Sequence, residues 1–426
     1  MCLTLPAKVV KVKGLQAEIL ASGAKQVVKI GTAAKIRAGD WVLYTNNFLI
    51  KKISQTEAEE ISALLGSYQG VTEAKLEKKL KDILTASSVR DLNVEEIEYL
   101  LGVDGQISQA ALFSQANVAR KANIKDHICI HGIIEFSNHC QNDCLYCGLR
   151  RSNDKVSRYR LSPEKIIKIA VAAVNNRGYK ILVLQSGEDD YYSDGKIELI
   201  IKEIKKQARV FIYLSIGDRS EAAYKKFKVA GASGVLYRFE TSNPDIYVSL
   251  HPGDSLEKRL ENLEMMRNLG YALSSGPLIG LPAQTLKDLA SDITLMKKLG
   301  VFMPSMGPLI PSAETPLAGE KKIDFGLVLK MIAASRLVMP KARIPVTTAM
   351  ETLARGEGIS IDEARQKCFM AGANSVMLNL TPETQRQKYY IYENKFFDVE
   401  KKYENWGLFK GELSYRMLEE ELRVSI

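Results

Sequence analysis

Apolar and polar residues alternate along the first fifty positions, which is the period of a half-buried β-strand. Glycines separate the runs AKVVKVKG, LQAEILA, KQVVKIG and GDWVLYTNNFLIKKI. Many short strands at this spacing favour a small barrel. The next stretch, SQTEAEEISALLGS, has apolar residues at helical spacing. We therefore expect a small all-β, OB-like barrel with a C-terminal helix over residues 1–66.

Apolar positions then recur at helical spacing from residue 71 to residue 125, as in VTEAKLEKKLKDILTA and SQAALFSQANVARKAN. Gly66 and Gly70 mark the boundary before this stretch. We expect a helical segment over residues 67–125 that leads into the next domain.

From position 127 onward, candidate strands alternate with amphipathic helices. The eight candidate strands are residues 127–138, 180–187, 210–217, 234–241, 272–280, 302–311, 344–350 and 375–382. Eightfold alternation predicts an α/β fold, a parallel (β/α)8 TIM barrel over residues 126–400, followed by a tail over residues 401–426. Each strand ends in polar or glycine residues, and the active site of such a barrel lies at the carboxyl ends of its strands.

Composition narrows the class of protein. The chain has 426 residues, enough for two or more domains. No apolar run reaches the ~18–20 residues of a membrane span, and the N-terminus lacks a signal-peptide pattern. We therefore expect a cytoplasmic protein with no membrane partner, in which the six cysteines are free thiols or metal ligands.

Charge adds little to this picture. The net charge is +9, but the lysines are interspersed with acids, as on solvated helix faces. We expect no nucleic-acid partner, whereas a slightly basic surface suits an acidic protein partner.

The stretch SNHCQNDCLYCGLR follows the first barrel strand and carries Cys140, Cys144 and Cys147. Structural zinc and most iron–sulfur clusters take four protein ligands, and no fourth cysteine lies nearby. His139 would complete a Cys3His zinc site, but adjacent residues rarely both reach one tetrahedral ion. A 4Fe–4S cluster with one open iron needs only three thiolates and leaves a position for a cofactor. We favour the cluster, and zinc or a coincidental group of thiols are the alternatives.

The spacing Cys-x3-Cys-x2-Cys, with Tyr146 just before the last cysteine, resembles that of the radical S-adenosylmethionine (SAM) superfamily. The resemblance implies that the amino and carboxylate groups of SAM chelate the open iron. It also implies that the reduced cluster cleaves SAM to methionine and a 5′-deoxyadenosyl radical. The electron would come from a donor such as flavodoxin or ferredoxin.

Further motifs resemble HydE, a maturase of the iron–iron hydrogenase, and the related methylornithine synthase, over about residues 71–400. They are EFSNHCQNDCLYCGLRR, VLQSGEDDYY, RFETSNP, GPLIPSAETPLA, IPVTTAM and GANSVMLNLTP. The resemblance implies cofactor-binding residues at the strand ends, namely Tyr146, Gln185, Ser186, Gly187, Glu188, Ser215, Arg238, Glu240, Arg259, Gly276, Leu278 and Gly280. It implies that Thr347, Thr348 and Met350 face the substrate as catalytic residues. Taken singly, these residues also fit buried Arg–Glu pairs, turn glycines and ordinary barrel packing.

The chain departs from the HydE pattern in its substrate half. HydE proteins commonly have an arginine where Gly234 stands and a small hydroxyl residue where Tyr213 stands, and Leu378 replaces a usual proline. Cys368 stands alone near the C-terminal end and is expected to be a buried thiol. These departures leave open a substrate other than that of HydE.

Residues 1–66, which begin MCLTLPAKVVKV, resemble HypC, a small chaperone of nickel–iron hydrogenase maturation. The second-position cysteine of that family helps to carry an iron fragment, so the resemblance implies that Cys2 is a ligand or carrier thiol. The chain lacks the usual histidine of that family near Thr45 and its glycine near Asn47. The alternative is a small apolar residue that happens to be second.

The sequence therefore predicts a radical SAM enzyme that acts on a small, iron-bound or thiol-bound substrate in hydrogenase-type maturation. Its front domain would meet a maturation protein partner. One alternative is a carbon-skeleton mutase like methylornithine synthase, which acts on an amino acid. The other is a non-catalytic scaffold, which would not cleave SAM.

Overall fold

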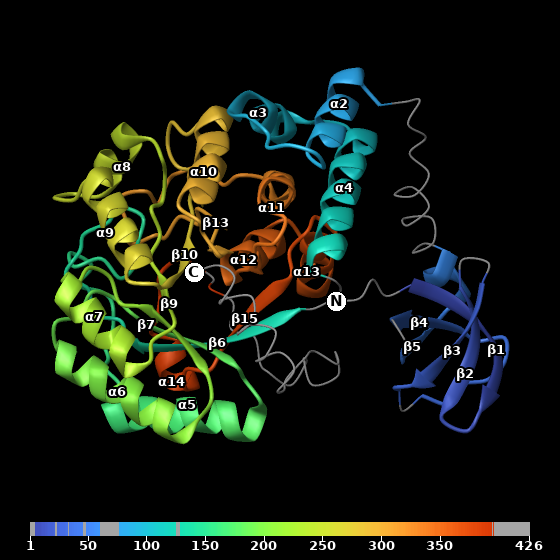
Figure 1. Ribbon diagram of the computed structural model, residues 1–426, viewed down its shortest axis with the longest axis horizontal. Helices are drawn as coiled ribbons and strands as arrows, with labels where there is room; N and C mark the ends of the chain where they lie inside the picture. Colours follow the sequence, from blue (N-terminus) through green and yellow to red (C-terminus); the bar gives the residue numbers. More distant parts are fainter. Residues whose placement is uncertain are drawn as a thin grey trace.

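The computed structural model describes residues 5–21, 24–32, 34–45, 48–59, 76–124, 128–393 and 395. Figure 1 shows a small barrel, in dark blue, and a larger barrel with helices around it. Each barrel has its own cluster of buried apolar side chains. Among the helices that the structure describes, none combines the length and apolarity needed to cross a bilayer.

The small barrel confirms the all-β prediction for the first part of the chain. Its strands close in the order β1-β2-β3-β5-β4. Their bounds are β1 Leu5–Lys13, β2 Gln16–Ala21, β3 Ala24–Ile30, β4 Trp41–Thr45 and β5 Phe48–Ile53. The alternating apolar residues face inward, so that Val9, Ile19, Val28, Val42 and Leu49 are buried. Residues 55–59 begin the predicted helix, and its remainder lies outside the described residues.

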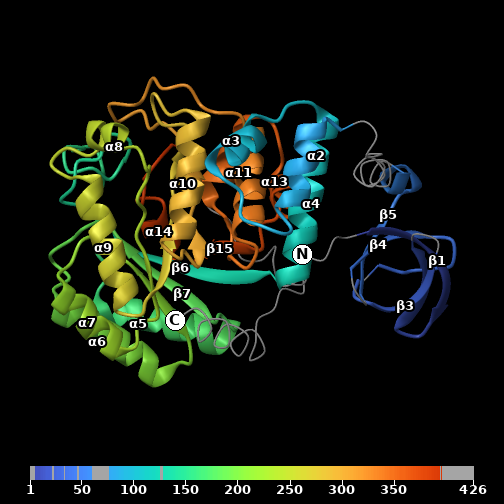
Figure 2. The same ribbon diagram turned by 45° about the horizontal axis from the view of Figure 1, so that its top comes forward.

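Three helices precede the large barrel, as the helical spacing predicted. They are α2 Lys78–Ala86, α3 Val94–Gly102 and α4 Gln106–Ile124. Asn93 and Glu96 form a reciprocal capping box that fixes the start of α3. In Figure 2 these helices lie beside α10, α11 and α13, and contacts join α3 to α10 and α4 to α11.

Each of the eight predicted strands contributes to one parallel sheet, with the order β12-β10-β9-β8-β7-β6-β15-β14. Their bounds are β6 Cys129–Ser137, β7 Ile181–Ser186, β8 Phe211–Ser215, β9 Gly234–Leu236, β10 Ala272–Ser275, β12 Met303–Pro304, β14 Pro345–Val346 and β15 Ser375–Asn379. Neighbours in the chain are neighbours in the sheet, which is the (β/α)8 arrangement. In the described residues the sheet ends at β12 and β14, so the barrel is nearly closed. The prediction for 344–350 was wrong at its end, because residues 348–350 begin helix α12, Thr348–Gly356, which Thr347 caps.

Two predicted strands are interrupted. The stretches expected at 272–280 and 302–311 each split, and their second parts, β11 Leu278–Ile279 and β13 Gly307–Pro308, pair with each other as a separate small sheet. Gly276 stands at the first break, where an added Cβ would lie 2.9 Å from the carbonyl oxygen of Ser305. This close approach of two backbones requires glycine.

Helices cover the outside of the large barrel. They are α5 Pro163–Arg177, α6 Asp194–Gln207, α7 Glu221–Ala230, α8 Pro244–Leu250, α9 Leu256–Asn268, α10 Leu286–Lys298, α11 Phe325–Val338, α12 Thr348–Gly356, α13 Ile361–Met370 and α14 Glu383–Arg386. Serine hydroxyl groups cap several N-termini, at Ser162, Ser220, Ser255 and Ser360. Inside the barrel, an apolar cluster that includes Val183, Tyr213 and Met303 fills the lumen.

Candidate active site at the carboxyl end of the large barrel

The three cysteines lie in the loop that follows β6, at the carboxyl end of that strand. Arg158 holds this loop from inside, because its guanidinium donates to the carbonyl oxygens of Asn138, Leu149, Arg150 and Asn153. None of these acceptors is a carboxylate. The positive charge of Arg158 therefore stays available to the thiols, and it lowers the pKa of Cys140 and Cys147 against the larger effect of burial.

Burial raises the pKa of all three thiols, and that of Cys147 rises to about 12. The neighbouring thiols add to this rise at Cys144 and Cys147. Thiolates so placed need a bound cation. In the described part of the chain, no three His, Cys, Asp or Glu side chains converge closely enough to hold one metal ion. Three thiols that each bind a different iron of a cluster need not converge on a point, so the donor set fits a 4Fe–4S cluster.

Gly187, at the end of β7, lets the cysteine loop approach closely. An added Cβ would lie 2.2 Å from the carbonyl oxygen of His139 and 2.8 Å from the Cβ of Cys140. The next residue, Glu188, accepts a hydrogen bond of 3.0 Å at its carbonyl oxygen from the backbone N–H of Gln141. The end of β7 thus contacts the cysteine loop directly through its backbone.

The carboxylate of Glu188 points toward the end of β8. It occupies the space above Gly217, where an added Cβ would lie 1.9 Å from Glu188 Cγ. Burial raises the pKa of Glu188, the nearby Asp218 adds to the rise, and Arg259 opposes it. A half-buried carboxylate beside a guanidinium can accept hydrogen bonds from an ammonium group.

Arg259, near the start of α9, is held on three sides. Its Nε donates to the carbonyl oxygen of Arg238 at 2.8 Å, and its Nη1 lies 3.3 Å from Asp218 Oδ1. The guanidinium carbon lies 3.8 Å from the ring centroid of Tyr237, which is a stacked cation–π contact. The planar group is therefore fixed in orientation, as recognition of a carboxylate requires.

Arg238 and Glu240 follow β9 and form an ion pair of 3.1 Å. Glu240 has φ of 65°, a left-handed conformation that is uncommon outside glycine. Its carbonyl oxygen accepts from the backbone N–H of Leu278, which ties β9 to β11. An added Cβ at Gly307 would lie 3.7 Å from both Arg238 Nη1 and Thr347 Oγ1, so these two side chains approach the same point of the mouth.

Tyr146 and Leu278 belong to one apolar cluster, with Leu145, Leu250 and Leu281. The hydroxyl of Tyr146 donates to His251 Nε2 at 2.9 Å, and His251 Nδ1 donates to the carbonyl oxygen of Tyr247 at 2.8 Å. This network assigns the proton of the neutral ring to Nδ1. Burial lowers the pKa of His251, which keeps the ring neutral. No sequence pattern marked His251, which follows the C-terminus of α8, as a residue of the site.

Three of the remaining predicted cofactor residues, Gln185, Ser186 and Gly280, form local hydrogen bonds. Ser186 donates to the carbonyl oxygen of Gly187 at 2.6 Å, and Gln185 Nε2 donates to the hydroxyl of Tyr389 at 3.2 Å. Ser215 ends β8 opposite Gln185 in the register and is partly exposed. At Gly280, φ is 89° and the backbone N–H donates to Gln284 Oε1.

The predicted substrate residues differ in their surroundings. Thr347 caps α12, where its hydroxyl accepts from the backbone N–H of Met350 at 3.4 Å. The hydroxyl groups of Thr348 and Tyr392 lie 2.6 Å apart in a hydrogen bond. Met350 is buried in the main apolar core. The two threonines thus lie at the mouth of the barrel, whereas the side chain of Met350 belongs to the core.

Several polar residues of the mouth were not predicted. Glu135 interrupts the apolar run of β6, and its carboxylate pairs with the ammonium of Lys395 and accepts from Asn379 Nδ2 at 2.8 Å. The glutamate inside the stretch HGIIEFSN was a usable signal, because a lone acid in a buried strand needs a partner. Nothing near Lys395 in the sequence marked it as that partner.

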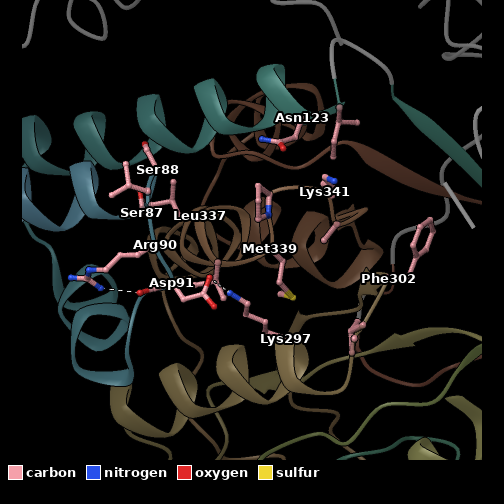
Figure 3. Close-up of a pocket in the computed structure, with 17 residues that line it drawn as sticks. Ser87, Ser88, Arg90, Asp91, Asn123, Lys297, Phe302, Leu337, Met339 and Lys341 are labelled. Atoms are coloured by element: carbon pink, nitrogen blue, oxygen red, sulfur yellow. Dashed lines mark hydrogen bonds and ion pairs between the residues drawn. The ribbon is translucent and has the colours of Figure 1, made fainter. Parts of the chain in front are cut away.

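A separate pocket of about 890 Å3 lies at the opposite end of the barrel (Figure 3). Its lining includes Phe302 and Ala342, which precede β12 and β14, and Asn123 at the end of α4. Lys297 pairs with Asp91 across its edge. Because the predicted chemistry lies at the carboxyl ends of the strands, we do not assign this pocket to the active site. Cys2 lies outside the described residues.

The chain is similar to known proteins over both parts. Residues 134–296 match the radical SAM superfamily, residues 1–65 match the HupF/HypC family, and residues 305–402 match the biotin and thiamin synthesis associated domain. The [FeFe] hydrogenase maturase subunit HydE of Thermotoga maritima is 42% identical over 321 residues, which cover 75% of this chain and 90% of that protein.

More distant similarity reaches a second type of enzyme. The 3-methylornithine synthase of Methanosarcina barkeri is 26% identical over 71% of this chain and 83% of that protein. A crystal structure of methylornithine synthase superposes with a TM-score of 0.69 at 23% identity, over 79% of this chain and 99% of that one. At 23% identity, this structural similarity is evidence for the fold alone.

Proposed function

The chain belongs to the HydE family of radical SAM enzymes, and we propose that it cleaves SAM to act on a small substrate during assembly of a hydrogenase-type metal centre. The observation that carries this proposal is the loop after β6. Its three cysteines lie at the carboxyl end of the barrel, beside Gly187 and Glu188 of the next strand end. The relative from Thermotoga maritima is named an [FeFe] hydrogenase maturase subunit, and this name supports a role in maturation.

Cys140, Cys144 and Cys147 would hold three irons of a 4Fe–4S cluster, and SAM would bind beside them. When bound, the cluster and SAM supply a one-electron reduction that breaks a carbon–sulfur bond of SAM. The protein holds the thiolates in a half-buried loop, and Arg158 offsets their charge. A reduced flavodoxin or ferredoxin would deliver the electron.

Residues at the ends of β7 and β9 and near the start of α9 would orient SAM. The fixed guanidinium of Arg259 suits its carboxylate, and the half-buried carboxylate of Glu188 suits its ammonium group. The apolar cluster of Tyr146 and Leu278 would lie along the adenine, and Arg238 with Glu240 would border the same face. Gln185, Ser186, Ser215, Gly276 and Gly280 complete the predicted set. Each of these roles follows from the family resemblance together with the local chemistry.

Thr347, Thr348 and Arg238 would face the substrate. Hydroxyl and guanidinium groups are donors, so this part of the mouth favours a substrate with a carboxylate or another anionic group. Met350 is buried in the apolar core at the start of α12 and would act on the pocket by supporting that helix.

A carbon-skeleton mutase that acts on an amino acid is the second candidate. The sequence similarity to 3-methylornithine synthase over most of that enzyme favours it. Tyr213, where HydE proteins commonly have a small hydroxyl residue, is consistent with a substrate other than that of HydE. Formation of 5′-deoxyadenosine that depends on an added amino acid would distinguish it. A scaffold without catalysis would cleave no SAM even with a reduced cluster.

The front domain would receive or deliver the fragment on which the barrel acts. Its match to the HupF/HypC family supports contact with a maturation protein, through Cys2 as a ligand or carrier thiol. The test is turnover and iron transfer with that partner protein. A Cys2→Ala variant should keep SAM cleavage and lose transfer, and unchanged transfer would contradict this role.

The proposed function as a whole is tested by anaerobic reconstitution with iron and sulfide, followed by reduction in the presence of SAM. The proposal expects methionine and 5′-deoxyadenosine as products. Variants of Cys140, Cys144 or Cys147 should form neither. Zinc binding without a cluster would instead favour the scaffold.

A further inference from the structure

The chain after α14 crosses the mouth of the barrel and contacts the cysteine loop. We call residues 388–395, as far as the structure describes them, the roof segment. The carbonyl oxygen of Ile391 accepts from the backbone N–H of Gly148 at 2.9 Å, and that of Lys388 accepts from Asn138 Nδ2 at 2.8 Å. An added Cβ at Gly148 would lie 2.2 Å from the carbonyl oxygen of Tyr390. The roof segment therefore lies directly against the loop that carries the cysteines.

The roof segment also bonds to two side chains of the predicted site. The hydroxyl of Tyr389 accepts from Gln185, at the end of β7, and the hydroxyl of Tyr392 pairs with Thr348, at the start of α12. On a further side, Glu393 Oε1 accepts from the backbone N–H of Ala313 at 3.1 Å. These bonds connect the segment to several edges of the mouth.

Lys395 fixes the far end of this segment inside the protein. Its ammonium bonds to the carboxylate of Glu135, and both side chains are only 2% exposed. The same ammonium donates to the carbonyl oxygen of Tyr389 at 3.3 Å and lies 4.6 Å from the centroid of that ring. The second oxygen of Glu135 is occupied by Asn379. Removing one charge from such a pair leaves the other buried without a counter-charge, which strongly disfavours the closed arrangement.

The position of this ion pair gives it more than a packing role. Glu135 lies on β6, the strand that leads into the cysteine loop, whereas Lys395 comes from the other end of the barrel sequence. The pair therefore joins the start and the end of the barrel domain at the place where the cofactor and substrate would meet. A tie of this kind holds the roof segment closed as long as both charges are present.

We propose that Lys395 is a positioning residue that latches the roof segment over the active site through Glu135. So latched, the segment holds the cysteine loop, Gln185 and Thr348 in place and shields the mouth from water. Exchange of a small substrate requires the roof segment to open. This inference deepens the proposed function and rests on it for the identity of the site, but the latch itself is a property of the chain without cofactors.

The test compares Lys395→Met with Lys388→Met, which makes the same chemical change at an exposed position of the roof segment. Hydrogen–deuterium exchange of the protein without cluster or SAM is measured over residues 388–395 and over α3 and α4 as a reference. We expect Lys395→Met to raise exchange in the roof segment by about tenfold or more while the reference helices keep their protection. Lys388→Met should match the parent, and Lys395→Arg should restore most of the protection.

A second measurement reports on the shielding of the site. After reconstitution, the rate of cluster loss to an added chelator should rise in Lys395→Met and not in Lys388→Met. If Lys395→Met fails to fold, the neutral double variant Lys395→Met with Glu135→Gln replaces it. It should fold, because no buried charge is left unpaired. Its roof segment should still exchange faster, because position 395 no longer bonds to position 135 or to the carbonyl oxygen of Tyr389.

Unchanged exchange in the roof segment of the charge-removing variants would overturn the proposal. Faster exchange throughout the barrel would overturn it as well, because Lys395 would then support only the fold. Neither outcome depends on catalysis. A protein that forms no cluster but shows the local opening would contradict the proposed function and leave the latch standing.

Discussion

The ring of Tyr213 occupies the space that a side chain at position 234 would need. The two residues are direct partners in the parallel register of β8 and β9. An added Cβ at Gly234 would lie 2.3 Å from Tyr213 Cε1 and 2.6 Å from two further ring atoms. Tyr213 is buried in the lumen cluster, so its ring has packed neighbours around it. The large residue on one strand and the glycine on the next therefore form a complementary pair that shapes the lumen.

A Gly234→Ala substitution should destabilise the barrel by about 1–3 kcal/mol, because the ring must shift within a packed lumen. In a Tyr213→Ser background the same substitution should cost close to nothing. Urea unfolding of the four proteins of this cycle measures the coupling. The matched control is Gly195→Ala in α6, where no atom lies within 4 Å of the added Cβ and the helix should gain stability. Equal destabilisation in both backgrounds would contradict the pairing.

A Gly187→Ala substitution should impair cluster assembly. The added methyl would collide with the backbone of His139, which cannot give way without moving Cys140. We expect the iron and sulfide content after reconstitution to fall markedly, while the unfolding free energy falls by about 1–3 kcal/mol. Gly195→Ala again serves as the control. Full cluster content in the variant would show that the approach of the two loops is not needed.

An Arg259→Lys substitution should weaken SAM binding about tenfold or more, which corresponds to 1.4 kcal/mol. A lysine cannot at once bond to the carbonyl oxygen of Arg238, pair with Asp218 and stack on Tyr237. Isothermal titration of the reconstituted enzyme measures the change. Lys258→Met is a suitable control, since Lys258 pairs with the same Asp218 at 2.9 Å but is largely exposed. Equal losses in the two variants would point to Asp218 rather than to the guanidinium.

His131 should make the barrel sensitive to acid. The side chain is fully buried on β6, and burial lowers its pKa from 6.5 to about 3, with Arg343 adding to the effect. Between pH 6.5 and pH 3, the ring of His131 therefore carries a proton in the unfolded chain but not in the folded chain. The contribution of His131 to the free energy of unfolding is complete above pH 6.5. It is lost as the pH falls toward 3, by up to about 1.4 kcal/mol per pH unit.

A His131→Leu variant should lose this part of the pH dependence. Neither ring nitrogen of His131 has a hydrogen-bond partner among the described residues, so the variant should be at least as stable as the parent at pH 7. Urea unfolding at pH 7 and at pH 5 measures both effects. The same loss of stability between these pH values in the variant would assign the acid sensitivity to other groups.

The sequence predicted the strands and helices of both barrels because each has a clear apolar period and glycine or serine boundaries. It placed the three cysteines and Glu188 at one end of the large barrel, since parallel strands share the direction of their carboxyl ends. It did not predict the split of the strands at 272–280 and 302–311, which depends on the approach of Gly276 to Ser305. A contact between residues so far apart in the chain leaves no local pattern.

The same limit applies to the site. The roles of Arg259 and Glu240 came from a resemblance, whereas their partners Asp218, Tyr237 and Leu278 follow only from the folded chain. His251 and Lys395 lie in segments where no residue pattern distinguishes them from other loop residues. Their importance comes from long-range partners, namely Tyr146 for the histidine and Glu135 for the lysine.

The measurement that tests the central claim most directly is electron paramagnetic resonance of the reconstituted, reduced protein with and without SAM. The account predicts a 4Fe–4S signal that shifts when SAM is added, because SAM fills the open iron. Cys144→Ala should abolish the signal, and Cys368→Ala, a change at a buried thiol, should keep it. A protein that carries zinc and forms no cluster, or a cluster signal that SAM leaves unchanged, would contradict the account.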